Sequence, residues 1–433
     1  MVGIKAEWDP LKKVVMHRPG IEMFFSLIEP YASLYDRAFS QNEALREHER
    51  LEHILMHEFR VDVIRLKDFI LQEAERSSKV KEELVKMAEE RVEFRGDEED
   101  VKMAKDEFSR YKDIYDSEFF FNLILLSPKV TLERGRGERA IYYNVTVREP
   151  LGNLYFMRDQ QAVTDKGIIL SRMSKPQRRR ETQVTKFLWK LMGEEIVHEI
   201  KEPGTFEGGD FIPMKDFALI GTGDRTNQEG IEQILKHGVS FDEVAVVHQP
   251  AHPLIPGDQT DPMINMHLDT YFNVPSSNVV IGCDTLLKRA KIDVYIKESE
   301  GNYRKEEERN LNLYDYIKEK GFEIINITTL EQMSYASNFL TIKDGTILAI
   351  ETERIVKRTL ANLEASARLN PERYGKLLEQ AKKDYEHLKN EGQFFPHKKE
   401  MYKNGIDVYT VDLTNLTGGY GGAHCMTCSL RRG

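Results

Sequence analysis

One local order of elements recurs along this 433-residue chain: two short β-like segments joined by a tight turn, then a helical segment, then another strand. The clearest copy begins near residue 160. There QAVTD and GIILSRM flank the turn Asp165-Lys166-Gly167, and an amphipathic helix that stops at Gly193 precedes EEIVHEI. One ββαβ unit of this size cannot bury its own faces, so several units must pack together. The repeat therefore predicts a multi-unit α/β fold.

Four further segments follow the same order. GDFIPM and FALIGTG precede a helix whose start, Thr226 to Glu229, predicts a capping box, and EVAVVHQ follows that helix. TYFNV with VVIGC begins another unit, and NFLTI with ILAI begins a fourth. The N-terminal copy runs from KKVVMHRPG through a helix over residues 41–58 to RVDVIRL. Five such units favour a closed five-bladed ββαβ propeller; an open α/β sheet is the alternative.

Two charge-rich segments interrupt the repeat. Residues 67–120 predict a helical insertion, and residues 355–395 predict a helical hairpin whose second helix begins at Asn370-Pro371. Amphipathic helices of this kind are expected to cover a sheet edge. Because no Gly/Ser-rich or Pro-rich linker divides the chain, we expect residues 1–433 to form a single domain with these two insertions.

Composition restricts the partners and the compartment. Acidic residues exceed basic ones by 72 − 62 = 10, which disfavours a nucleic-acid-binding surface. No apolar run approaches the roughly 18–20 residues of a membrane span, so no membrane association is expected. The start MVGIKAEWDP lacks the apolar core of a signal peptide, and three cysteines are too few for a disulfide scaffold. A cytoplasmic location is the resulting expectation.

Polar residues gather just before the first strand of three units. These segments are NLYFMRD (153–159), FEGGD (206–210) and MHLDT (266–270). In a closed propeller such positions converge on one central cavity. His267 and Asp269 lie two apart and so share a face if the segment is extended. That pair suits a base beside a cation-binding acid, although a polar pair without a catalytic role is the alternative.

The C-terminal segment GGYGGAHCMTC combines glycines with two cysteines. Glycines let the backbone approach a ligand closely, so Cys425 can reach into a confined site. Cys425 and Cys428 form a CxxC, which could also be a redox pair, half of a zinc site or a structural feature. Cys283 is the one other cysteine, so no second CxxC exists to complete a zinc site.

Taken in order, NLYFMRD, PQRRRET, FEGGD, GTGDRT, HLDT and GGAHCMTC resemble the arginine deiminase family of the guanidine-modifying (pentein) superfamily. The resemblance implies a five-bladed ββαβ propeller and a hydrolase that acts on C–N bonds of linear amidines. It implies deimination of L-arginine to L-citrulline and ammonia through a covalent cysteine amidino (thiouronium) intermediate. No metal or cofactor is implied, the partner is a small guanidino substrate, and a homo-oligomer is typical.

The resemblance also implies roles for single residues. Cys425 is the expected nucleophile, His267 the general acid/base, and Glu207 the residue that positions the histidine–substrate network. Asp159 and Asp269 are expected to bind the guanidinium. The expected substrate-binding residues are Asn153, Phe156, Arg178, Asp210, Arg225 and Tyr420.

This chemistry is consistent with the residue types. A guanidinium is a poor electrophile, two carboxylates fix its plane through charge-assisted hydrogen bonds, and a thiolate is the best side-chain nucleophile for its carbon. Two departures from the family bear on the substrate. Tyr420 stands where the family usually has an arginine between glycines, and the segment between the last two strands is unusually long. The alternatives are a deiminase of another guanidino compound, an amidinotransferase, or a non-catalytic CxxC binding or redox protein.

Overall fold

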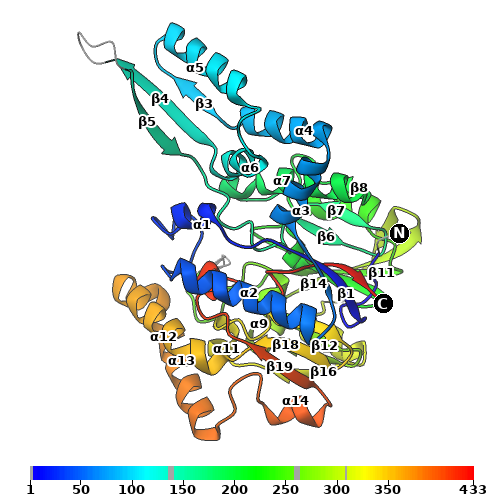
Figure 1. The fold of residues 1–433 in the computed structure, drawn as a ribbon. Helices are drawn as coiled ribbons and strands as arrows, with labels where there is room; N and C mark the ends of the chain where they lie inside the picture. The colour runs from blue at the N-terminus through cyan, green and yellow to red at the C-terminus, as the bar shows by residue number, and fades with distance from the viewer. Residues whose placement is uncertain (1–2, 135–140, 258–263, 308–309) are drawn as a thin grey trace.

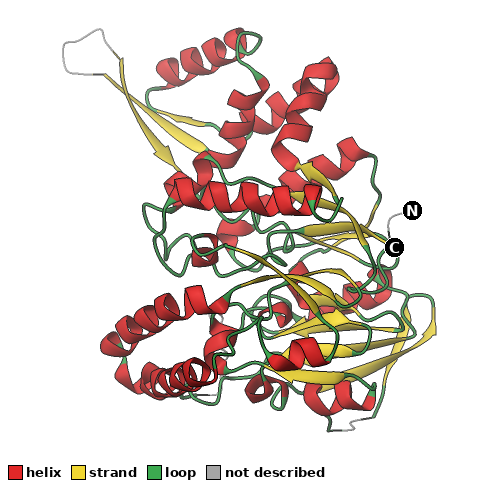
Figure 2. Cartoon of the chain, turned by 60° about the horizontal axis from the view of Figure 1, so that its bottom comes forward, coloured by secondary structure: helices red, strands yellow, loops and turns green. Residues whose placement is uncertain are grey.

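The computed structural model describes residues 3–134, 141–257, 264–307 and 310–433. The architecture is mixed α/β, with small sheets in the body of the molecule and helices around them (Figures 1 and 2). The N- and C-terminal segments lie close together on one side of the body (Figure 1). None of the described helices combines the length and the apolar character that a membrane crossing requires.

Five sheets repeat one strand pattern, in which an antiparallel pair is followed by a third strand parallel to the second. In four of these sheets the three strands come in chain order. The first two sheets consist of β6 (Gln161–Val163), β7 (Ile168–Leu170) and β8 (Ile196–Glu199), and of β9 (Phe211–Pro213), β10 (Phe217–Thr222) and β11 (Glu243–His248). The next two consist of β12 (Phe272–Ser276), β13 (Val279–Gly282) and β16 (Glu323–Asn326), and of β17 (Leu340–Lys343), β18 (Thr346–Ile350) and β19 (Asp407–Val411).

The N-terminal unit borrows its first strand from the other end of the chain. β20 (Cys428–Arg432) pairs antiparallel with β1 (Leu11–Met16), and β1 pairs parallel with β2 (Asp62–Arg65). The unit therefore has the same strand pattern as the other four, although its strands come from both chain ends. No sheet within the described ranges closes on itself. The closed five-bladed propeller therefore stays a prediction, while the mixed α/β class is established.

Local sequence explains most of these elements. Gly167, at φ +137°, makes the turn between β6 and β7, and Gly193, at φ +68°, ends α7 (Glu181–Met192) in the left-handed conformation. The predicted capping box at α8 (Gln228–Gln233) is wrong. Asn227 is the cap and accepts from the Gly230 amide, because it is the last residue with extended backbone before the helix. Thr226 is thereby left to bind Asp210.

The remaining elements surround or extend the five units. They are α1 (Ile21–Ser26), α2 (Gln41–His57), α9 (Asp284–Leu287), β14 (Ile292–Ser299), β15 (Asn302–Lys305), α10 (Leu313–Glu319), α11 (Thr329–Met333) and α14 (Lys399–Lys403). β14 and β15 extend the β9–β11 sheet to five strands. The helices of the repeated units share hydrophobic clusters with their sheets; Val184 and Leu188 of α7, for example, are buried in the same cluster as Ile168 of β7.

Two segments lie outside the repeated units. After β2 come α3 (Leu66–Arg76), α4 (Ser78–Glu89), α5 (Glu98–Tyr111) and α6 (Ser117–Leu126), with a sheet of β3 (Glu93–Arg95), β4 (Pro128–Arg134) and β5 (Ile141–Val147) that the helical pattern did not indicate. Figure 1 shows this segment projecting from one end of the body. Between β18 and β19 lie the antiparallel helices α12 (Thr352–Leu369) and α13 (Pro371–Glu391), and Asn370 caps the second.

A buried ion pair joins the two ends of the chain beside the β1–β20 pairing. Arg432 Nη2 donates to Glu7 Oε1 at 2.9 Å, and both side chains are almost fully buried. Burial raises the pKa of Glu7, but Arg432 and Arg158 outweigh it and hold that pKa well below its usual range. Glu7 is therefore ionised, and its charge depends on the cations that surround it.

Replacing Arg432 should be strongly destabilising. Arg432→Met leaves the Glu7 carboxylate buried with less compensation, and breaking a buried pair in this way costs about 3–5 kcal/mol. The neighbouring Arg431→Met is the control: Arg431 pairs with Glu194 at the surface, so its loss should change stability by less than about 0.5–1 kcal/mol. Denaturant unfolding of both variants checks this. Similar midpoints for the two would contradict the proposed importance of the buried pair.

Candidate active site

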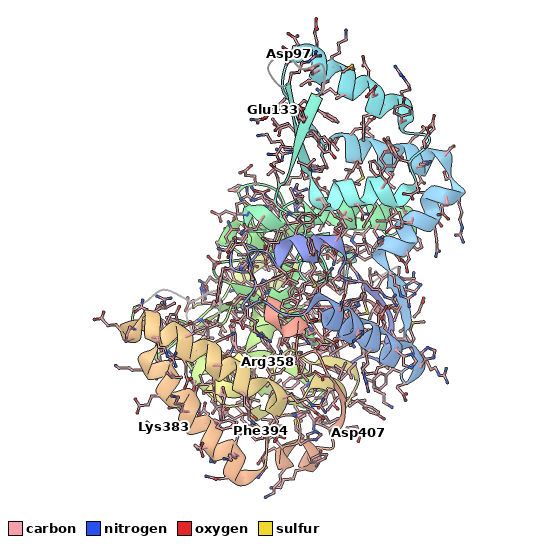
Figure 3. The ribbon with its side chains drawn as sticks, turned by 60° about the vertical axis from the view of Figure 1, so that its left-hand side comes forward. Asp97, Glu133, Arg358, Lys383, Phe394 and Asp407 are labelled. Atoms are coloured by element: carbon pink, nitrogen blue, oxygen red, sulfur yellow. The ribbon has the colours of Figure 1, made fainter. Side chains whose placement is uncertain are left out.

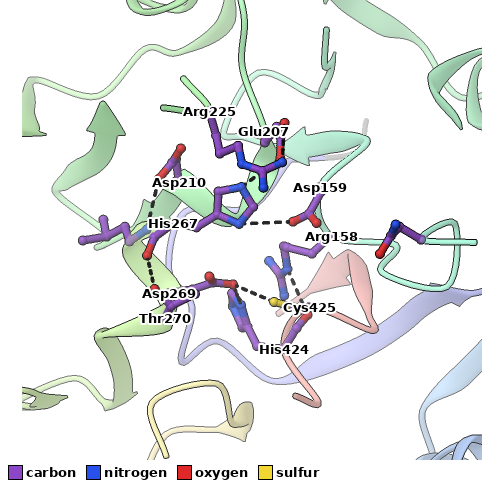
Figure 4. Close-up of polar contacts among 12 residues, drawn as sticks. Arg158, Asp159, Glu207, Asp210, Arg225, His267, Asp269, Thr270, His424 and Cys425 are labelled. Carbon is purple, nitrogen blue, oxygen red and sulfur yellow. Dashed lines mark hydrogen bonds and ion pairs between the residues drawn. The ribbon is translucent and has the colours of Figure 1, made fainter. Parts of the chain in front are cut away.

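Side chains from all five units meet at one place, and each comes from the loop before the first strand of its unit. Figure 4 labels those of four units: Asp159, Glu207, His267, Asp269 and Cys425. Asp159 precedes β6, Glu207 precedes β9, His267 and Asp269 precede β12, and Cys425 precedes β20. The fifth loop, before β17, contributes Asn338, for which the sequence analysis named no role. These six side chains are at most 4% exposed. The site is therefore built from one repeated position of the fold.

Cys425 is held in a turn by Asn338. The Asn338 Oδ1 accepts from the amides of Cys425 at 3.0 Å and Gly422 at 2.8 Å, and its Nδ2 lies 3.0 Å from the Cys425 sulfur. A Cβ on Gly421 would come 2.5 Å from the Phe156 ring and 2.9 Å from the Cys425 Cβ, so this glycine is needed for close approach. Asn338 could have been found by applying the loop-before-first-strand pattern to the fourth unit.

The environment of the Cys425 thiol favours its neutral form. Burial raises the pKa of Cys425 well above its usual value, and the carboxylates of Asp269 and Asp159 raise it further. Asp269 Oδ2 lies 3.5 Å from the sulfur. A cation placed between the two carboxylates would offset their charges and favour the thiolate.

His267 lies between two carboxylates and is charged at neutral pH. Its Nε2 is 2.9 Å from Glu207 Oε2, and its Nδ1 is 3.7 Å from Asp159 Oδ1. Burial lowers the pKa of His267, but Asp159, the Glu207 hydrogen bond and Asp210 outweigh it and raise the pKa to about 9. Gly209 allows this packing, because a Cβ there would lie 2.7 Å from Nδ1. His267 is thus an imidazolium that can donate a proton.

Glu207 is anchored on both oxygens. Its Oε1 accepts from the Ser174 amide at 3.1 Å while Oε2 binds His267. Burial raises the pKa of Glu207, yet Arg225 and His267 outweigh it and lower the pKa to about 2. A carboxylate fixed in this way sets the orientation of the imidazolium.

Asp269 is held by a histidine whose role the sequence analysis left open. His424 Nδ1 lies 2.8 Å from Asp269 Oδ2, and His424 Nε2 lies 3.2 Å from Glu7 Oε1. Burial raises the pKa of Asp269, but His424 outweighs it and keeps that pKa below its usual value. The position of His424 directly before Cys425 was a visible signal in the sequence. Nothing local to Glu7 indicated that it lies behind the site.

The two arginines expected at the substrate's amino-acid end differ in their partners. Arg178 donates to Asp159 at 2.8 Å and to Glu181 at 2.9 Å, so it is bound to the carboxylate that was expected to receive the guanidinium. Arg225 is 2% exposed, and its Nε and Nη1 make no hydrogen bond with any described residue. The nearest carboxylate oxygens to it are 3.4 Å away on Asp224 and 3.8 Å away on Glu207. Arg225 is therefore the better placed to bind a carboxylate.

A small cavity lies among Asp159, His267, Arg225 and Cys425. Of the four other expected binding residues, three line this cavity and one does not. Asn153, Phe156 and Tyr420 line it, and Asn153 Nδ2 also donates to the Ser33 carbonyl. Asp210 lies behind it, where it accepts from Thr226 Oγ1 at 2.6 Å and from the Leu268 amide at 3.0 Å. Asp210 thus holds the loop of His267 and Asp269, and burial raises its pKa to about 6.

The site carries both unpaired acceptors and unpaired donors. Asp159 Oδ1 and Asp269 Oδ1 are buried and accept no hydrogen bond from a described residue, as Arg225 Nε and Nη1 donate none. Buried polar groups are ordinarily paired, so such atoms mark places for a ligand. The free volume of the cavity is about 10 Å³. This arrangement suits a ligand with a planar cation at one end and a carboxylate at the other.

The metal and redox alternatives can be compared with the same geometry. Asp159, Glu207 and His267 offer ligand-type atoms within 4.8 Å of one another, but they are bound to each other and to Arg178. Neither cysteine belongs to that group. Cys428 lies in β20 in a different hydrophobic cluster from Cys425, and burial raises its pKa to about 12. The two thiols therefore have separate environments, which does not favour a shared metal or redox site.

A family model and curated relatives match this chain over most or all of its length. The family model described as arginine deiminase matches residues 32–432. The chain is 26% identical to the arginine deiminase of Halobacterium salinarum over 506 residues, covering 100% of this chain and 96% of that protein. It is 24% identical to the arginine deiminase of Borrelia garinii subsp. bavariensis over 456 residues, covering 100% and 98%.

A solved structure shares the fold. It is the product-bound N-terminal domain of ArgZ, an arginine dihydrolase from the ornithine–ammonia cycle in cyanobacteria. It aligns with a TM-score of 0.51 at 13% identity, over 98% of each chain. Because the family model covers nearly the whole chain and the site residues follow the repeated loops of this fold, the chain belongs to the arginine deiminase family.

Proposed function

We propose that this protein hydrolyses L-arginine to L-citrulline and ammonia through a covalent amidino intermediate on Cys425. The observation that carries the proposal is the pairing of unsatisfied groups. Asp159 and Asp269 each have a buried carboxylate oxygen that accepts no hydrogen bond from a described residue, and Arg225 has unpaired guanidinium donors. Asp159 and Arg225 line the same cavity as Cys425, and Asp269 lies 3.5 Å from the Cys425 sulfur. Membership of the arginine deiminase family supports the same activity.

Binding of the substrate offsets the charges that hold the thiol neutral. The substrate guanidinium donates hydrogen bonds to Asp159 and Asp269, and it competes with Arg178 for Asp159. The substrate carboxylate binds Arg225. With a cation between the two acids, the pKa of Cys425 falls and its proton is lost to solvent. Substrate binding thereby creates the nucleophile.

The covalent steps need one proton donor that later becomes a base. The Cys425 thiolate attacks the guanidinium carbon and a C–S bond forms. The His267 imidazolium protonates the departing amine, the C–N bond breaks and ammonia leaves. The neutral imidazole then takes a proton from water, which attacks the thiouronium carbon; the C–S bond breaks and the ureido product is released. Ammonia takes up the remaining proton as ammonium.

We also propose that the five repeated units form the closed five-bladed ββαβ propeller of the pentein fold. Support comes from five sheets with one strand pattern, from the five matching loops that contribute to one site, and from the similarity to the ArgZ domain. In such a ring the loops before the first strands face a common centre, which explains how residues from five units reach one cavity.

Cys425 should carry the intermediate and Cys428 should not. Cys425→Ser should abolish turnover, because a hydroxyl is a far weaker nucleophile than a thiolate, whereas Cys428→Ala should keep most of the wild-type kcat. Mass spectrometry of acid-quenched wild-type protein should find an adduct of arginine less ammonia on the peptide that contains Cys425. Equal loss of activity in the two variants would favour a CxxC function and contradict the assignment.

The activity should fall as pH rises through about 9. The imidazolium of His267 is needed for ammonia to leave, and its pKa is raised to about 9, so the charged form is complete below the ordinary value near 6.5 and is lost through about 9. Glu207→Gln removes a negative charge that raises this pKa and should move the alkaline limb of kcat/KM to lower pH. Glu181→Gln removes a buried carboxylate that does not contact His267 and should leave the limb in place. An unmoved limb in Glu207→Gln would remove His267 from the acid role.

Arg225 should set the affinity for the carboxylate. Arg225→Met removes charged hydrogen bonds worth about 1.5–3 kcal/mol, so KM for L-arginine should rise roughly ten- to a hundredfold. Agmatine, which lacks the carboxylate, should be a much poorer substrate for the wild type and should be affected little by the substitution. Steady-state ammonia release measures both compounds. If the wild type turned over agmatine as well as L-arginine, the carboxylate contact would be wrong.

A further inference from the structure

A second cavity adjoins the site. Its volume is about 400 Å³, against about 10 Å³ free in the site cavity, and the two share Met266 and Tyr420 in their walls. We call it the outer chamber. Tyr420 therefore stands between the reacting groups and a space large enough for atoms beyond arginine itself.

The outer chamber is walled on one side by the hairpin of α12 and α13. Asn362 and Ser366 of α12 and Tyr374 of α13 line it. Figure 3 shows the two helices side by side on the flank of the molecule, with Arg358 on α12 and Lys383 on α13 labelled. The hairpin is fixed to the body by a buried apolar face that includes Leu363, Leu377, Ala381 and Leu388. The long segment that departs from the family pattern thus builds part of a cavity next to the site.

The walls of the outer chamber suit a neutral or cationic group. Five tyrosines contribute to it: Tyr31, Tyr35, Tyr335, Tyr374 and Tyr420. Among the described residues of its wall, Asp36 carries the one carboxylate, and its Oδ2 accepts from Arg37 at 2.8 Å and from Asn362 at 2.7 Å. No lysine, arginine or histidine belongs to the described residues of the wall. Aromatic faces with a carboxylate attract ammonium groups, and nothing in this wall compensates an anion.

This charge distribution sets the direction in which a substrate can extend. Among the described residues that line the site cavity, Arg225 carries unpaired cationic donors, so the carboxylate stays there. The α-amino side is then the side that can pass Tyr420 into the outer chamber. Resting on the proposed deimination, we infer that the protein also accepts arginine extended at its α-amino group, as the C-terminal residue of a short peptide, and that the outer chamber binds the extension.

Two dipeptides of identical composition test the direction. Gly-Arg keeps a free carboxylate on the arginine and extends its amino side, whereas Arg-Gly does the reverse. Ureido product formation should give Gly-Arg a kcat/KM within about tenfold of L-arginine and at least about tenfold above Arg-Gly; tenfold corresponds to about 1.4 kcal/mol. Gly-Arg no better than Arg-Gly would overturn the inference.

Filling the outer chamber tests its role as a binding site. Ser366 lines the outer chamber and not the site cavity. Ser366→Trp should lower kcat/KM for Gly-Arg at least about tenfold and change that for L-arginine less than about threefold, while Ser366→Ala should change neither. Equal loss for both compounds would make the outer chamber only an entrance and overturn the inference.

Asp36→Asn provides a second variant that keeps the side-chain shape. The substitution should lower kcat/KM for Gly-Arg, which carries an ammonium on the extension. It should leave kcat/KM for Nα-acetyl-L-arginine unchanged, because that compound carries no ammonium there. Equal effects on both compounds would count against the proposed pairing. If the protein turns over L-arginine but not Gly-Arg, this inference is wrong and the proposed function stands. If none of these guanidino compounds gives a ureido product, the proposed function is wrong as well.

Discussion

The antiparallel pairing of β20 with β1 is the contact on which the site depends. It joins the two ends of the chain, with Val15 opposite Cys428 and Leu11 opposite Arg432. The turn that carries Cys425 is thereby placed against the loops of the other units. The buried contacts of Glu7 with Arg432 and His424 add a polar link at the same junction, and His424 in turn holds Asp269. Because Cys425, the proposed nucleophile, lies just before β20, this pairing positions it as much as it stabilises the fold.

The electrostatics of the site form one coupled system. Buried carboxylates on Asp159, Glu207 and Asp210 raise the pKa of His267 and keep it charged. Burial together with the carboxylates of Asp269 and Asp159 raises the pKa of Cys425 and keeps it neutral, so Asp159 acts on both groups. A guanidinium is a cation of the shape and charge that would relieve the second effect without removing the first. In the proposed function, selectivity and activation arise from Asp159 and Asp269, and Arg178, already bound to Asp159, is the internal competitor that the substrate must displace.

The outer chamber, which we infer binds the extension of a substrate, is separate from the site cavity, where we propose that the reaction occurs. The proposed reacting groups come from the loops of the five repeated units. Part of the wall of the outer chamber comes from an insertion between β18 and β19 and from Tyr420, whose backbone is left-handed at φ +72°. Changes in the α12–α13 hairpin can therefore alter what lies beyond the guanidino group without disturbing Cys425 or His267. This separation is the physical basis for expecting relatives with the same reaction and different substrates.

Much of this was determined by sequence alone, where the governing contacts are local. The β6–β7 turn, the end of α7 at Gly193 and the cap at Asn370 depend on neighbouring residues, and the structure has them as predicted. The loop before each first strand was a sound guide to the site, and applied to the fourth unit it would also have indicated Asn338. Tertiary structure decided the rest: the strand β20 that completes the N-terminal unit, the links from Glu7 to His424, and the position of Arg178 on Asp159. These contacts join residues far apart in the chain, and no local pattern records which distant partner a buried charge or an edge strand will find.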